Sequence, residues 1–587
     1  EVMKYTAEWR NLTERIGYWV DMEDPYITYK PKYMESVWWL LKQLYNKQLL
    51  YKGYTIQPYS PKAGTGLSSH ELNQPGCYRD VSDTTVVAQF KVKALVAAAA
   101  KALGAPTEPI HILAWTTTPW TLPSNTALAV GKEIEYVLVR TYNQYTFEPI
   151  TIIIGKPLLA KQFGKKFVEG DAAVLAAYTP ESKTIPYQIL GECKGADLVG
   201  TTYEQLIPWC SPAENADQAF RVIAGDFVTT DDGTGIVHIA PTFGADDARV
   251  AKEYGVPPML VKDAHDNLIP LVDLQGKFIT GHNIPEAFAG KYIKNEYYDA
   301  GQAPEKSWDV SLAILLKEEN KAFKVEKYVH SYPHCWRCKK PVIFRATDQW
   351  FIAVSKFKDR ALDVIEKDVR WIPDWGRDRI HNMVRDRSDW CISRQRVWGV
   401  PVPALKCRDC GAHSLTPDRV RSFADKVGES SEGSSIWWSR TVEELFGDRA
   451  VCDACGSRNV EKDGNILDVW FDSGVTHLAV LNERFGLSWP TEMYLEGSDQ
   501  HRGWFQSSLL TAVAVKEHAP YRNVLTHGFI LDGEGRKMSK SLGNVVLPQE
   551  VVGEYGADIL RLWVASTDYR NDVRISQTIM KSLSETY

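Results

Sequence analysis

The sequence lacks a long apolar run. Its longest apolar stretch, Ala94–Ala100, is followed at once by Lys101, whereas a membrane-spanning helix needs roughly 20 apolar residues. The first residues also lack the charged start, apolar core and small-residue cleavage site of a secretory signal. We therefore expect no transmembrane segment, no membrane partner and a cytoplasmic location.

The sequence also lacks polar low-complexity tracts and a strong charge of either sign. Hydrophobic residues make up 44% of the 587 positions, charged residues make up 24%, and the net charge is −6. This composition is typical of an ordered globular protein and excludes a uniformly basic coat for nucleic acid. Local basic segments such as Arg377–Arg396 could still bind a phosphate backbone, so composition leaves a nucleic-acid partner open.

Neither end of the chain has the features of a natural terminus. The chain begins at Glu1 inside an amphipathic pattern and stops just after the helical-looking segment Ile579–Leu583. We therefore expect an internal piece of a longer protein. A length of 587 residues predicts about four domains, or one domain with large insertions.

Two patterns alternate along the chain. One mixes helical periodicity with short strands and predicts an α/β domain, as in the helical segment Tyr33–Asn46. The other consists of short strands rich in Val, Ile, Thr and Tyr between Gly, Pro and Asn turns, and predicts a mainly β insertion. A Cys-rich, polar section predicts a second, smaller insertion. The expected segments are 1–82 (α/β), 83–325 (β insertion), 326–400 (α/β), 401–466 (Cys-rich insertion), 467–565 (α/β) and 566–587 (the start of a helical region).

A short basic motif is the most specific signal. Residues Gly535–Ser541 read Gly-Arg-Lys-Met-Ser-Lys-Ser and follow a predicted strand and turn. Lys537 and Lys540, close to a glycine turn, can neutralise the charge that develops on a triphosphate as pyrophosphate leaves. The alternative interpretation is a solvated basic loop. The residue order matches the Lys-Met-Ser-Lys-Ser signature of class I aminoacyl-tRNA synthetases, and the chain resembles that family.

The resemblance implies a parallel, doubly wound Rossmann-type sheet that binds Mg²⁺ with ATP. The segment Glu496–Phe505 is similar to the family's adenylate seat, where small residues let the backbone approach adenosine and polar groups bind ribose and the α-ammonium. In the alternative interpretation, Asp499 only caps a helix. By resemblance, the residues that contact or border the adenylate are Glu496, Gly497, Asp499, Gln500 and His527.

Two further stretches narrow the resemblance to one branch of the family. Trp390–Pro403 is similar to a segment shared by the isoleucine and valine enzymes, and Leu467–Gly474 resembles the isoleucine form. By resemblance, Trp470 and Trp504 line a pocket for a branched aliphatic side chain, although a single tryptophan is more often ordinary core. The resemblance implies L-isoleucine, ATP and tRNA(Ile) as partners. We also expect a monomer.

An apolar pocket of this kind rejects a smaller substrate poorly. One missing methylene changes binding by only about 1 to 3 kcal/mol, a general magnitude for which isoleucine and valine are the standard example. Valine should therefore be accepted at times, and the β insertion would remove it by hydrolysis. Its stretches Trp115–Asn125 and Gly233–Asp247 resemble the editing domain of the isoleucine, valine and leucine synthetases.

The two editing stretches carry the side chains that a hydrolytic site would use. Threonine hydroxyls and Asn125 could bind the terminal adenosine of tRNA and position a water, and Asp247 could anchor the α-ammonium. By resemblance, His238 excludes the larger isoleucine. The alternatives are an ordinary strand for the threonines and a helix start for Asp247. The candidate editing residues are Thr116, Thr117, Thr118, Thr121, Asn125, His238 and Asp247.

The cysteines cluster in Cys-x-x-Cys pairs. Four thiolates at Cys407, Cys410, Cys452 and Cys455 predict a tetrahedral structural zinc site, with reduced unliganded thiols as the alternative. A third pair, in the segment His334–Cys338, forms half a site. By resemblance to some bacterial relatives, the other half would be two cysteines where this chain has Ser60 and Ala63, so we expect that second zinc to be lost.

The family's His-Ile-Gly-His signature is absent from these residues. The resemblance places that signature upstream of Glu1, so we expect this piece alone to be poor at activation. Three hypotheses follow: an isoleucine–tRNA ligase in the intact parent, with a valine–tRNA ligase as a close variant; a stand-alone hydrolase of Val-tRNA(Ile); and a zinc-dependent binding module without catalysis. The intact lysine motif argues against the second, and the third leaves Asp247 unexplained.

Overall fold

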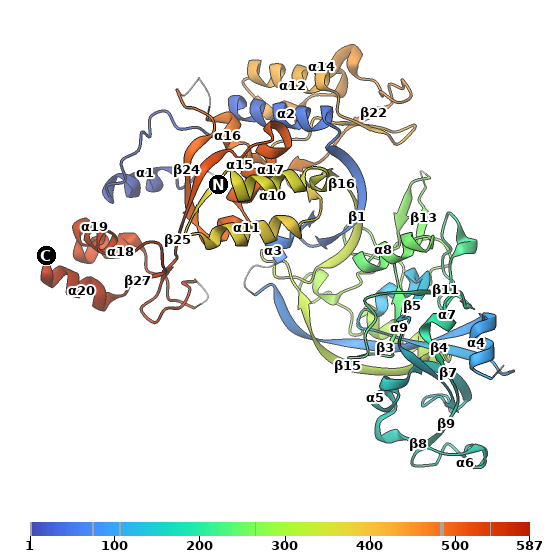
Figure 1. Cartoon of the computed structure of the whole chain (residues 1–587). Helices are drawn as coiled ribbons and strands as arrows, with labels where there is room; N and C mark the ends of the chain where they lie inside the picture. Colours follow the sequence, from blue (N-terminus) through green and yellow to red (C-terminus); the bar gives the residue numbers. More distant parts are fainter. Residues whose placement is uncertain (1–2, 73–75, 105–106, 265, 482–485, 540–541) are drawn as a thin grey trace. The chain divides into compact units, whose positions relative to one another are not determined.

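The computed structural model describes residues 3–72, 76–104, 107–264, 266–481, 486–539 and 542–587 (Figure 1). The chain divides into two compact units, one formed by Glu1–Gly53 with Gln349–Tyr587 and the other by Tyr54–Asp348. Both units contain helices and strands, which confirms the α/β class. Among the described residues, no helix has both the length and the apolarity needed to cross a membrane.

The first unit contains a parallel sheet of three strands in the order β17 (Arg370–Ile372), β25 (Tyr521–His527), β24 (Thr491–Gly497). Helix α17 (Trp504–Lys516) connects β24 to β25, and such a crossover helix is what parallel neighbours require. Most of α17 is buried, because α15 (Val469–Gly474) and other helices of the unit pack against it. The carboxyl ends of β24 and β25 therefore lie side by side.

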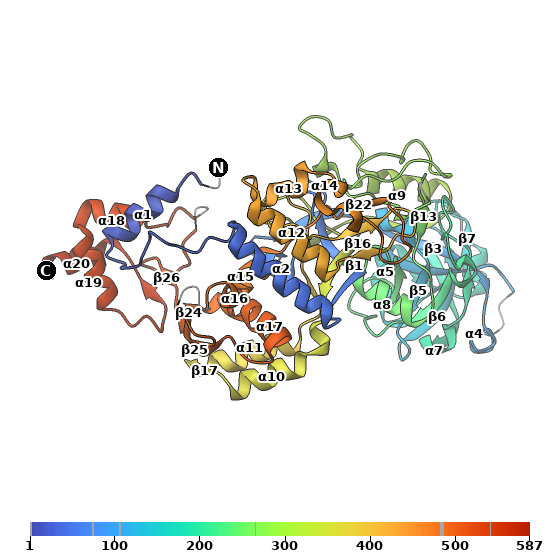
Figure 2. The same cartoon turned by 90° about the horizontal axis from the view of Figure 1, so that it is seen from above.

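Helix α2 (Pro31–Asn46) forms because apolar residues recur every three or four positions and a proline occupies its first turn. Its buried stripe packs against α12 (Pro417–Glu429), and the two helices lie side by side in both views (Figures 1 and 2). The Trp38 and Phe423 rings meet edge to face with centroids 4.8 Å apart. The buried residues of α2 are Tyr33, Met34, Val37, Trp38, Leu40, Leu41 and Leu44.

A small antiparallel sheet in the first unit consists of β20 (Leu405–Cys407), β21 (His413–Ser414) and β22 (Val460–Lys462). Further helices are α1 (Thr6–Arg15), α10 (Lys358–Lys367), α11 (Trp375–Arg385), α13 (Ile436–Ser439), α14 (Val442–Phe446), α16 (Thr476–Ala479), α18 (Pro548–Tyr555), α19 (Ala557–Ala565) and α20 (Gln577–Thr586). Further strands are β18 (Trp390–Cys391), β19 (Ser393–Arg394), β23 (Ile466–Leu467), β26 (Ile530–Leu531) and β27 (Val573–Arg574), and β1 (Leu50–Ser60) and β16 (Ile343–Ile352) run across the boundary between the units.

The second unit contains an eleven-stranded sheet that closes partly on itself. Strand β3 pairs with both β10 and β4, and the chain of pairings from β10 leads back to β4, so six strands form a closed ring. A closed ring leaves those strands without a free edge. The ring consists of β3 (Tyr78–Ala94), β10 (Thr202–Tyr203), β11 (Arg221–Ala224), β5 (Ala127–Val130), β12 (Ile236–Ile239) and β4 (Ile110–Thr116).

The rest of the sheet extends from this ring. Strands β7 (Pro149–Gly155), β6 (Glu135–Tyr142), β9 (Ile185–Lys194) and β8 (Phe167–Glu169) follow β4, and β15 (Ala322–Pro333) pairs with β3. The unit also contains β2 (Thr65–Gly66), β13 (Leu260–Lys262), β14 (Leu268–Pro270), α3 (Ser69–Leu72), α4 (Ala97–Ala102), α5 (Leu159–Phe163), α6 (Ala172–Ala176), α7 (Gly195–Leu198), α8 (Ala245–Glu253) and α9 (Trp308–Glu318).

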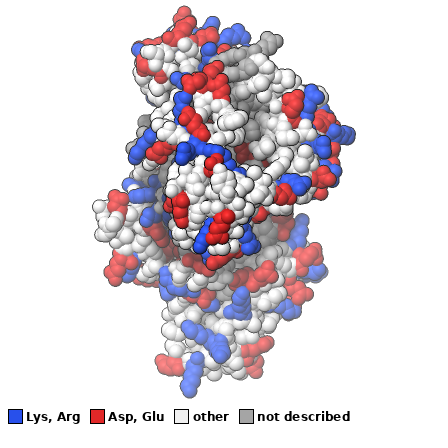
Figure 3. All heavy atoms as spheres, turned by 90° about the vertical axis from the view of Figure 1, so that its left-hand side faces the viewer, with Lys and Arg blue, Asp and Glu red and all other residues white. Residues whose placement is uncertain are grey.

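The surface carries charges of both signs. On the face drawn in Figure 3, Lys and Arg side chains alternate with Asp and Glu side chains and with uncharged areas. No single-sign field covers that face, as the net charge of −6 leads one to expect.

Candidate functional site

The threonine-rich stretch and His238 come together because of strand register in the second unit. Strands β4 and β12 are parallel, with Val237 opposite Trp115, so the next residues along each strand, His238 and Thr116, lie at the same level. The Thr121 hydroxyl lies 3.0 Å from His238 Nε2. The Thr118 hydroxyl lies 3.3 Å from that of Thr116 and 3.4 Å from that of Thr121. Three predicted threonines and the predicted histidine thus form one cluster.

A short 3-10 helix holds the threonines in this arrangement. The helix η1 (Pro119–Ser124) begins at Pro119, whose fixed φ suits a first helical position. The Thr121 hydroxyl donates to the Thr118 carbonyl at 2.8 Å. A hydroxyl has one proton, so Thr121 accepts from His238 Nε2, which fixes the tautomer with the proton on Nε2. Burial lowers the pKa of His238 to about 4, so the ring is neutral at pH 7.

The other predicted editing residues occupy different positions. Thr117 is half-buried in the bend that follows β4. Asn125 is buried and bonded inside the protein: its Oδ1 accepts from the Tyr203 hydroxyl at 2.7 Å, and its Nδ2 donates to the Ala127 carbonyl at 2.8 Å. This geometry favours a supporting position for Asn125 behind the threonines.

Asp247 lies in the first turn of α8 and reaches back to the end of β12. Its Oδ2 accepts from the backbone N–H of Ala240 at 2.8 Å, two residues beyond His238. Burial raises the pKa of the carboxyl to about 6. Asp247 is thus bonded just beyond the carboxyl end of β12, the short strand that carries His238, so the predicted carboxyl and the predicted histidine are tied to the same end of one strand.

A second group of predicted residues lies at the carboxyl ends of β24 and β25 in the first unit. Parallel pairing sets Gly497 opposite His527. A Cβ on Gly497 would lie 2.9 Å from Asp499 Oδ1 and 3.5 Å from the His527 ring, so the absence of a side chain lets the Asp499 carboxylate lie close to this backbone. Glu496 and Asp499 are exposed, and the Gln500 side-chain oxygen accepts from the Trp504 backbone N–H at 2.8 Å. The predicted adenylate residues therefore share one sheet end.

The two predicted pocket tryptophans are close to this sheet end. Trp504 stacks on Tyr494 with ring centroids 3.9 Å apart, and its Nε1 donates to the Ser473 carbonyl at 3.0 Å. A Cβ on Gly503 would lie 2.9 Å from the Trp470 ring, so the absence of a side chain there lets Trp470 approach the start of α17. Both tryptophans are half-buried, which leaves part of each ring open for contact.

The lysine motif is held by a carboxylate and an amide that the motif itself does not include. Asp532 accepts from the backbone N–H of Arg536 at 2.8 Å and from Asn544 Nδ2 at 2.8 Å, and these bonds lower the pKa of its carboxyl. Asn544 Oδ1 in turn accepts from the Ser539 backbone N–H at 2.9 Å. We call these bonds of Asp532 and Asn544 the latch. Lys537 lies in the segment that the latch holds, and its side chain is exposed. The other predicted lysine, Lys540, lies outside the described residues.

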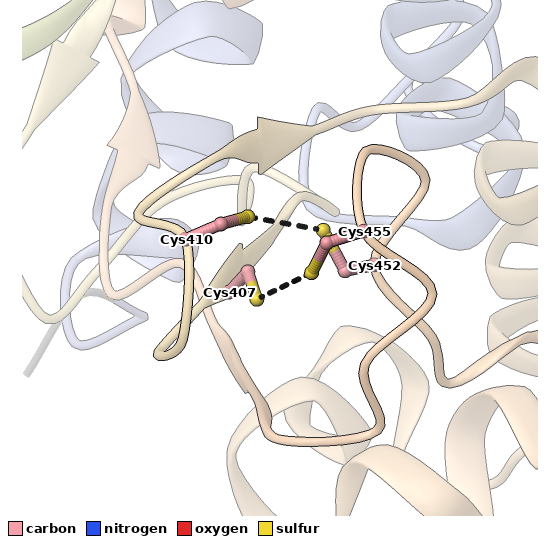
Figure 4. Close-up of side chains that lie close together, drawn as sticks. All are labelled: Cys407, Cys410, Cys452 and Cys455. Atoms are coloured by element: carbon pink, nitrogen blue, oxygen red, sulfur yellow. Dashed lines mark hydrogen bonds between the residues drawn. The ribbon is translucent and has the colours of Figure 1, made fainter.

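The four predicted cysteine ligands lie on two facing turns of the first unit, and their sulfur atoms all lie within 4.8 Å of one another (Figure 4). Cys407 Sγ lies 3.6 Å from Cys455 Sγ, and Cys410 Sγ lies 3.6 Å from Cys452 Sγ. Tetrahedral zinc with Zn–S bonds of about 2.3 Å needs sulfur atoms about 3.8 Å apart. The donor set and spacing therefore fit one zinc ion.

The two cysteine turns have the same construction. In each, the N–H of the first cysteine donates to a carbonyl five residues on, and a glycine with positive φ, Gly411 or Gly456, follows the second cysteine. Glycine tolerates that conformation without strain. Within the part of the chain that the structure describes, no other group of three or more His, Cys, Asp or Glu ligand atoms is gathered in this way. Near Cys338, the Ser60 hydroxyl lies 3.5 Å from its sulfur.

Sequence comparison supports the class of protein that these groups indicate. The model of class I tRNA synthetases (I, L, M and V) matches residues 1–576, and the chain belongs to this family. The isoleucine–tRNA ligase of Bacteroides fragilis is 44% identical over 96% of this chain and 52% of its own length. That of Caldicellulosiruptor saccharolyticus is 40% identical over 100% of this chain and 57% of its own length. The chain thus spans little more than half the length of these relatives.

A likeness to solved structures is weaker. The ternary complex of an Agrobacterium radiobacter LeuRS with tRNA and LeuAMS covers 99% of this chain and 62% of that chain at 14% identity, with a TM-score of 0.37. A likeness of this size carries no argument, and the family assignment depends on sequence.

Proposed function

We propose that the chain forms part of an isoleucine–tRNA ligase, which activates L-isoleucine with Mg-ATP and transfers it to tRNA(Ile) in the cytoplasm. The observation that carries this proposal is the gathering of Gly497, Asp499 and His527 at one sheet end, with Trp470 and Trp504 close by. The parallel strands there suit a Rossmann-type nucleotide site, since ligands of such sheets bind at the carboxyl ends of the strands. In this proposal, the catalytic α/β domain is interrupted by the β insertion (83–325) and the Cys-rich insertion (401–466), with the boundaries that the sequence predicts.

In the activation reaction, flat rings and small residues have separate tasks. Trp470 and Trp504 would bury the branched aliphatic side chain, and Gly497 would let adenosine approach the backbone. Asp499 and Gln500 would bind the α-ammonium and ribose, and Lys537 and Lys540 would stabilise charge on the leaving pyrophosphate. The protein would act as a monomer, with tRNA(Ile) as its macromolecular partner.

We further propose that the second unit removes misattached valine by hydrolysis. The threonine hydroxyls would orient a water and the terminal ribose, Asp247 would bind the α-ammonium, and His238 would exclude isoleucine by its bulk. The 3.0 Å contact between Thr121 and His238 supports the role given to His238, because it keeps the neutral ring in a fixed position.

A structural zinc ion would be held by Cys407, Cys410, Cys452 and Cys455, where it would hold two turns together.

Activation is tested with the full product of the gene by isoleucine-dependent exchange of pyrophosphate into ATP. Lys537→Ala and Lys540→Ala should each lower the exchange rate by about 100-fold, the typical effect of removing one charge-stabilising group. Lys581→Ala, at an exposed position in α20, is the control. An undiminished rate in Lys540→Ala would remove that lysine from the mechanism.

Editing is tested by release of amino acid from Val-tRNA(Ile) and Ile-tRNA(Ile). Asp247→Ala should abolish valine release, whereas Asp246→Ala, at the exposed neighbour, should not. His238→Ala should instead permit release of isoleucine, because the excluded volume is gone. Unchanged valine release in Asp247→Ala would show that the assigned anchor is wrong.

A further inference from the structure

A buried ionic cluster lies in the second unit, outside the residues assigned above. Lys294 Nζ lies 3.2 Å from both carboxylate oxygens of Asp83 and 3.6 Å from Asp309 Oδ2. Lys294 is only 5% exposed and Asp309 only 4%. His330 Nε2 lies 3.1 Å from Asp83 Oδ2, and the Tyr332 ring faces the lysine at 5.1 Å. Lys294 and Asp309 are therefore paired mainly with other groups of the cluster, while the Asp83 side chain keeps 21% exposure to water.

This cluster has one bond to the threonine segment. Asp309 Oδ1 accepts from the backbone N–H of Trp120 at 2.9 Å, while the other oxygen of the same carboxylate faces Lys294. Trp120 belongs to the first turn of η1, where backbone N–H groups have no partner inside the helix. Helix α9, which carries Asp309, packs against both β3 and η1. A single carboxylate thus joins a buried lysine to the helix that positions Thr121.

The side chain of Trp120 makes a second connection. Its ring meets Phe243 edge to face with centroids 5.0 Å apart. Phe243 follows β12 in the turn whose residue Ala240 donates to Asp247. Trp120 is therefore fixed through its backbone by Asp309 and through its ring by the turn that leads to the Asp247 helix. The two halves of the proposed editing site meet at this one residue.

Stability alone does not account well for such a cluster. Burying ions carries a desolvation cost, and well-packed apolar residues of similar volume are often as stable or more so. What the ions supply is direction, because a carboxylate between a lysine and a backbone N–H can take only one orientation. We propose that Asp83, Lys294 and Asp309 form a positioning device that sets the threonine helix against His238 and Asp247. The proposal deepens, and rests on, the proposed editing function.

The proposal makes Asp309 a positioning residue, since it acts through Trp120 and touches no reacting atom. Asp309→Ala removes the acceptor for the Trp120 N–H, whereas Asp309→Asn keeps an oxygen that can accept from Trp120 but turns an NH2 donor toward Lys294. Misplacement of reacting groups by about 1 Å can cost about 100-fold in rate. We expect Asp309→Ala to lower kcat for Val-tRNA(Ile) hydrolysis by about that factor, with KM for the tRNA unchanged, and Asp309→Asn to recover only part of the loss, because it keeps the acceptor for Trp120 and loses the ion pair with Lys294.

Two controls separate positioning from general damage. Lys294→Met should lower kcat in the same direction as Asp309→Ala, because the lysine orients the carboxylate. Arg140→Met breaks a different ion pair of the same unit, in which both Glu108 oxygens accept from one Arg140 nitrogen at 2.6 and 2.7 Å. Because this pair is partly exposed, Arg140→Met should change thermal stability little and leave kcat unchanged. Isoleucine-dependent pyrophosphate exchange should stay within about twofold of wild type in all variants, since positioning acts on one site only.

Amide hydrogen exchange of residues 116–125 gives a readout that does not need activity. Asp309→Ala should speed exchange in this segment selectively, and Asp309→Asn should restore part of the protection. If the full gene product fails to hydrolyse Val-tRNA(Ile), the proposed function fails, and the exchange measurement still decides the positioning role. Unchanged exchange in Asp309→Ala, or a kcat loss that Arg140→Met reproduces, would overturn the inference.

Discussion

At the scale of single residues, the ionisation of Asp247 would set the pH range of the proposed editing reaction. Burial raises the pKa of this carboxyl to about 6, and the proposed anchor for the α-ammonium must be ionised. For the free enzyme, kcat/KM for Val-tRNA(Ile) hydrolysis should therefore be constant above that pKa and fall about tenfold per pH unit below it. Asp247→Asn should remove the enzymatic rate at every pH, and Asp246→Ala should keep the inflection but move it to lower pH, because the Asp246 charge helps to raise the pKa of Asp247. An inflection that survives in Asp247→Asn belongs to another group.

The side-chain amide of Asn544 is a second single residue whose contribution to activity can be tested. It links Asp532 to the Ser539 backbone and so holds the segment that carries Lys537. Asn544→Ala should slow isoleucine-dependent pyrophosphate exchange by about tenfold, as expected when a positioned cation loses its support. Asn544→Asp, which can still accept from Ser539 but repels Asp532, should not rescue the rate. Full activity in Asn544→Ala would show that the latch is dispensable.

Functional residues that belong to a local sequence pattern could be predicted from the sequence. Functional residues whose partner lies far away along the chain could not. Cys407 and Cys410 stand out from spacing alone, and the threonine stretch stands out from its composition. By contrast, 189 positions separate Asp309 from Trp120, the group it binds, and nothing near Asp309 in sequence announces that contact. Asn544 lies close to the lysine motif, but apart from its neighbour Gly543 nothing in the local sequence indicates that it supports the motif.

At the scale of elements, the two cysteine turns depend on one another. The first turn lies between two strands of two or three residues, and the second lies between a 3-10 helix (Gly447–Arg449) and the three-residue strand β22, so a zinc ion would supply much of the stabilisation. We expect about one zinc per chain by metal analysis and loss of that zinc in Cys410→Ser. The loss should lower the melting temperature. Cys391→Ser, in β18, is the control, because Cys391 is not one of the four gathered cysteines. Zinc content that is unchanged in Cys410→Ser would exclude this site.

Strand-forming segments could be predicted from composition, but their partners could not. Most residues of β4 and β12 are apolar or β-branched, which indicates strands. Nothing local says that β4 pairs in parallel with β12 and antiparallel with β3, or that these pairings close a ring. Register is decided by burial of whole faces, which involves residues far apart in sequence. Local sequence patterns alone therefore could not predict that Thr116 and His238 lie next to each other.

At the scale of the whole molecule, each hydrophobic core belongs to one unit. The largest core cluster of the first unit includes Trp38 and Phe471, and that of the second includes Phe90 and Tyr297. A segment with its own core can fold alone. We expect residues 54–348, expressed by themselves, to unfold in one cooperative transition. The intact chain should show at least two transitions in calorimetry, because two separate cores need not melt together.

The excised segment also tests where hydrolysis resides. Thr121, His238 and the Asp309 cluster all lie within residues 54–348, so their mutual bonds need nothing from the first unit. The segment should therefore hydrolyse Val-tRNA(Ile) with a raised KM, because contacts made elsewhere on the tRNA are gone, and with kcat within about tenfold of the full gene product. Pyrophosphate exchange should be absent. A folded segment with no valine release would mean that the catalytic groups are completed by residues outside it.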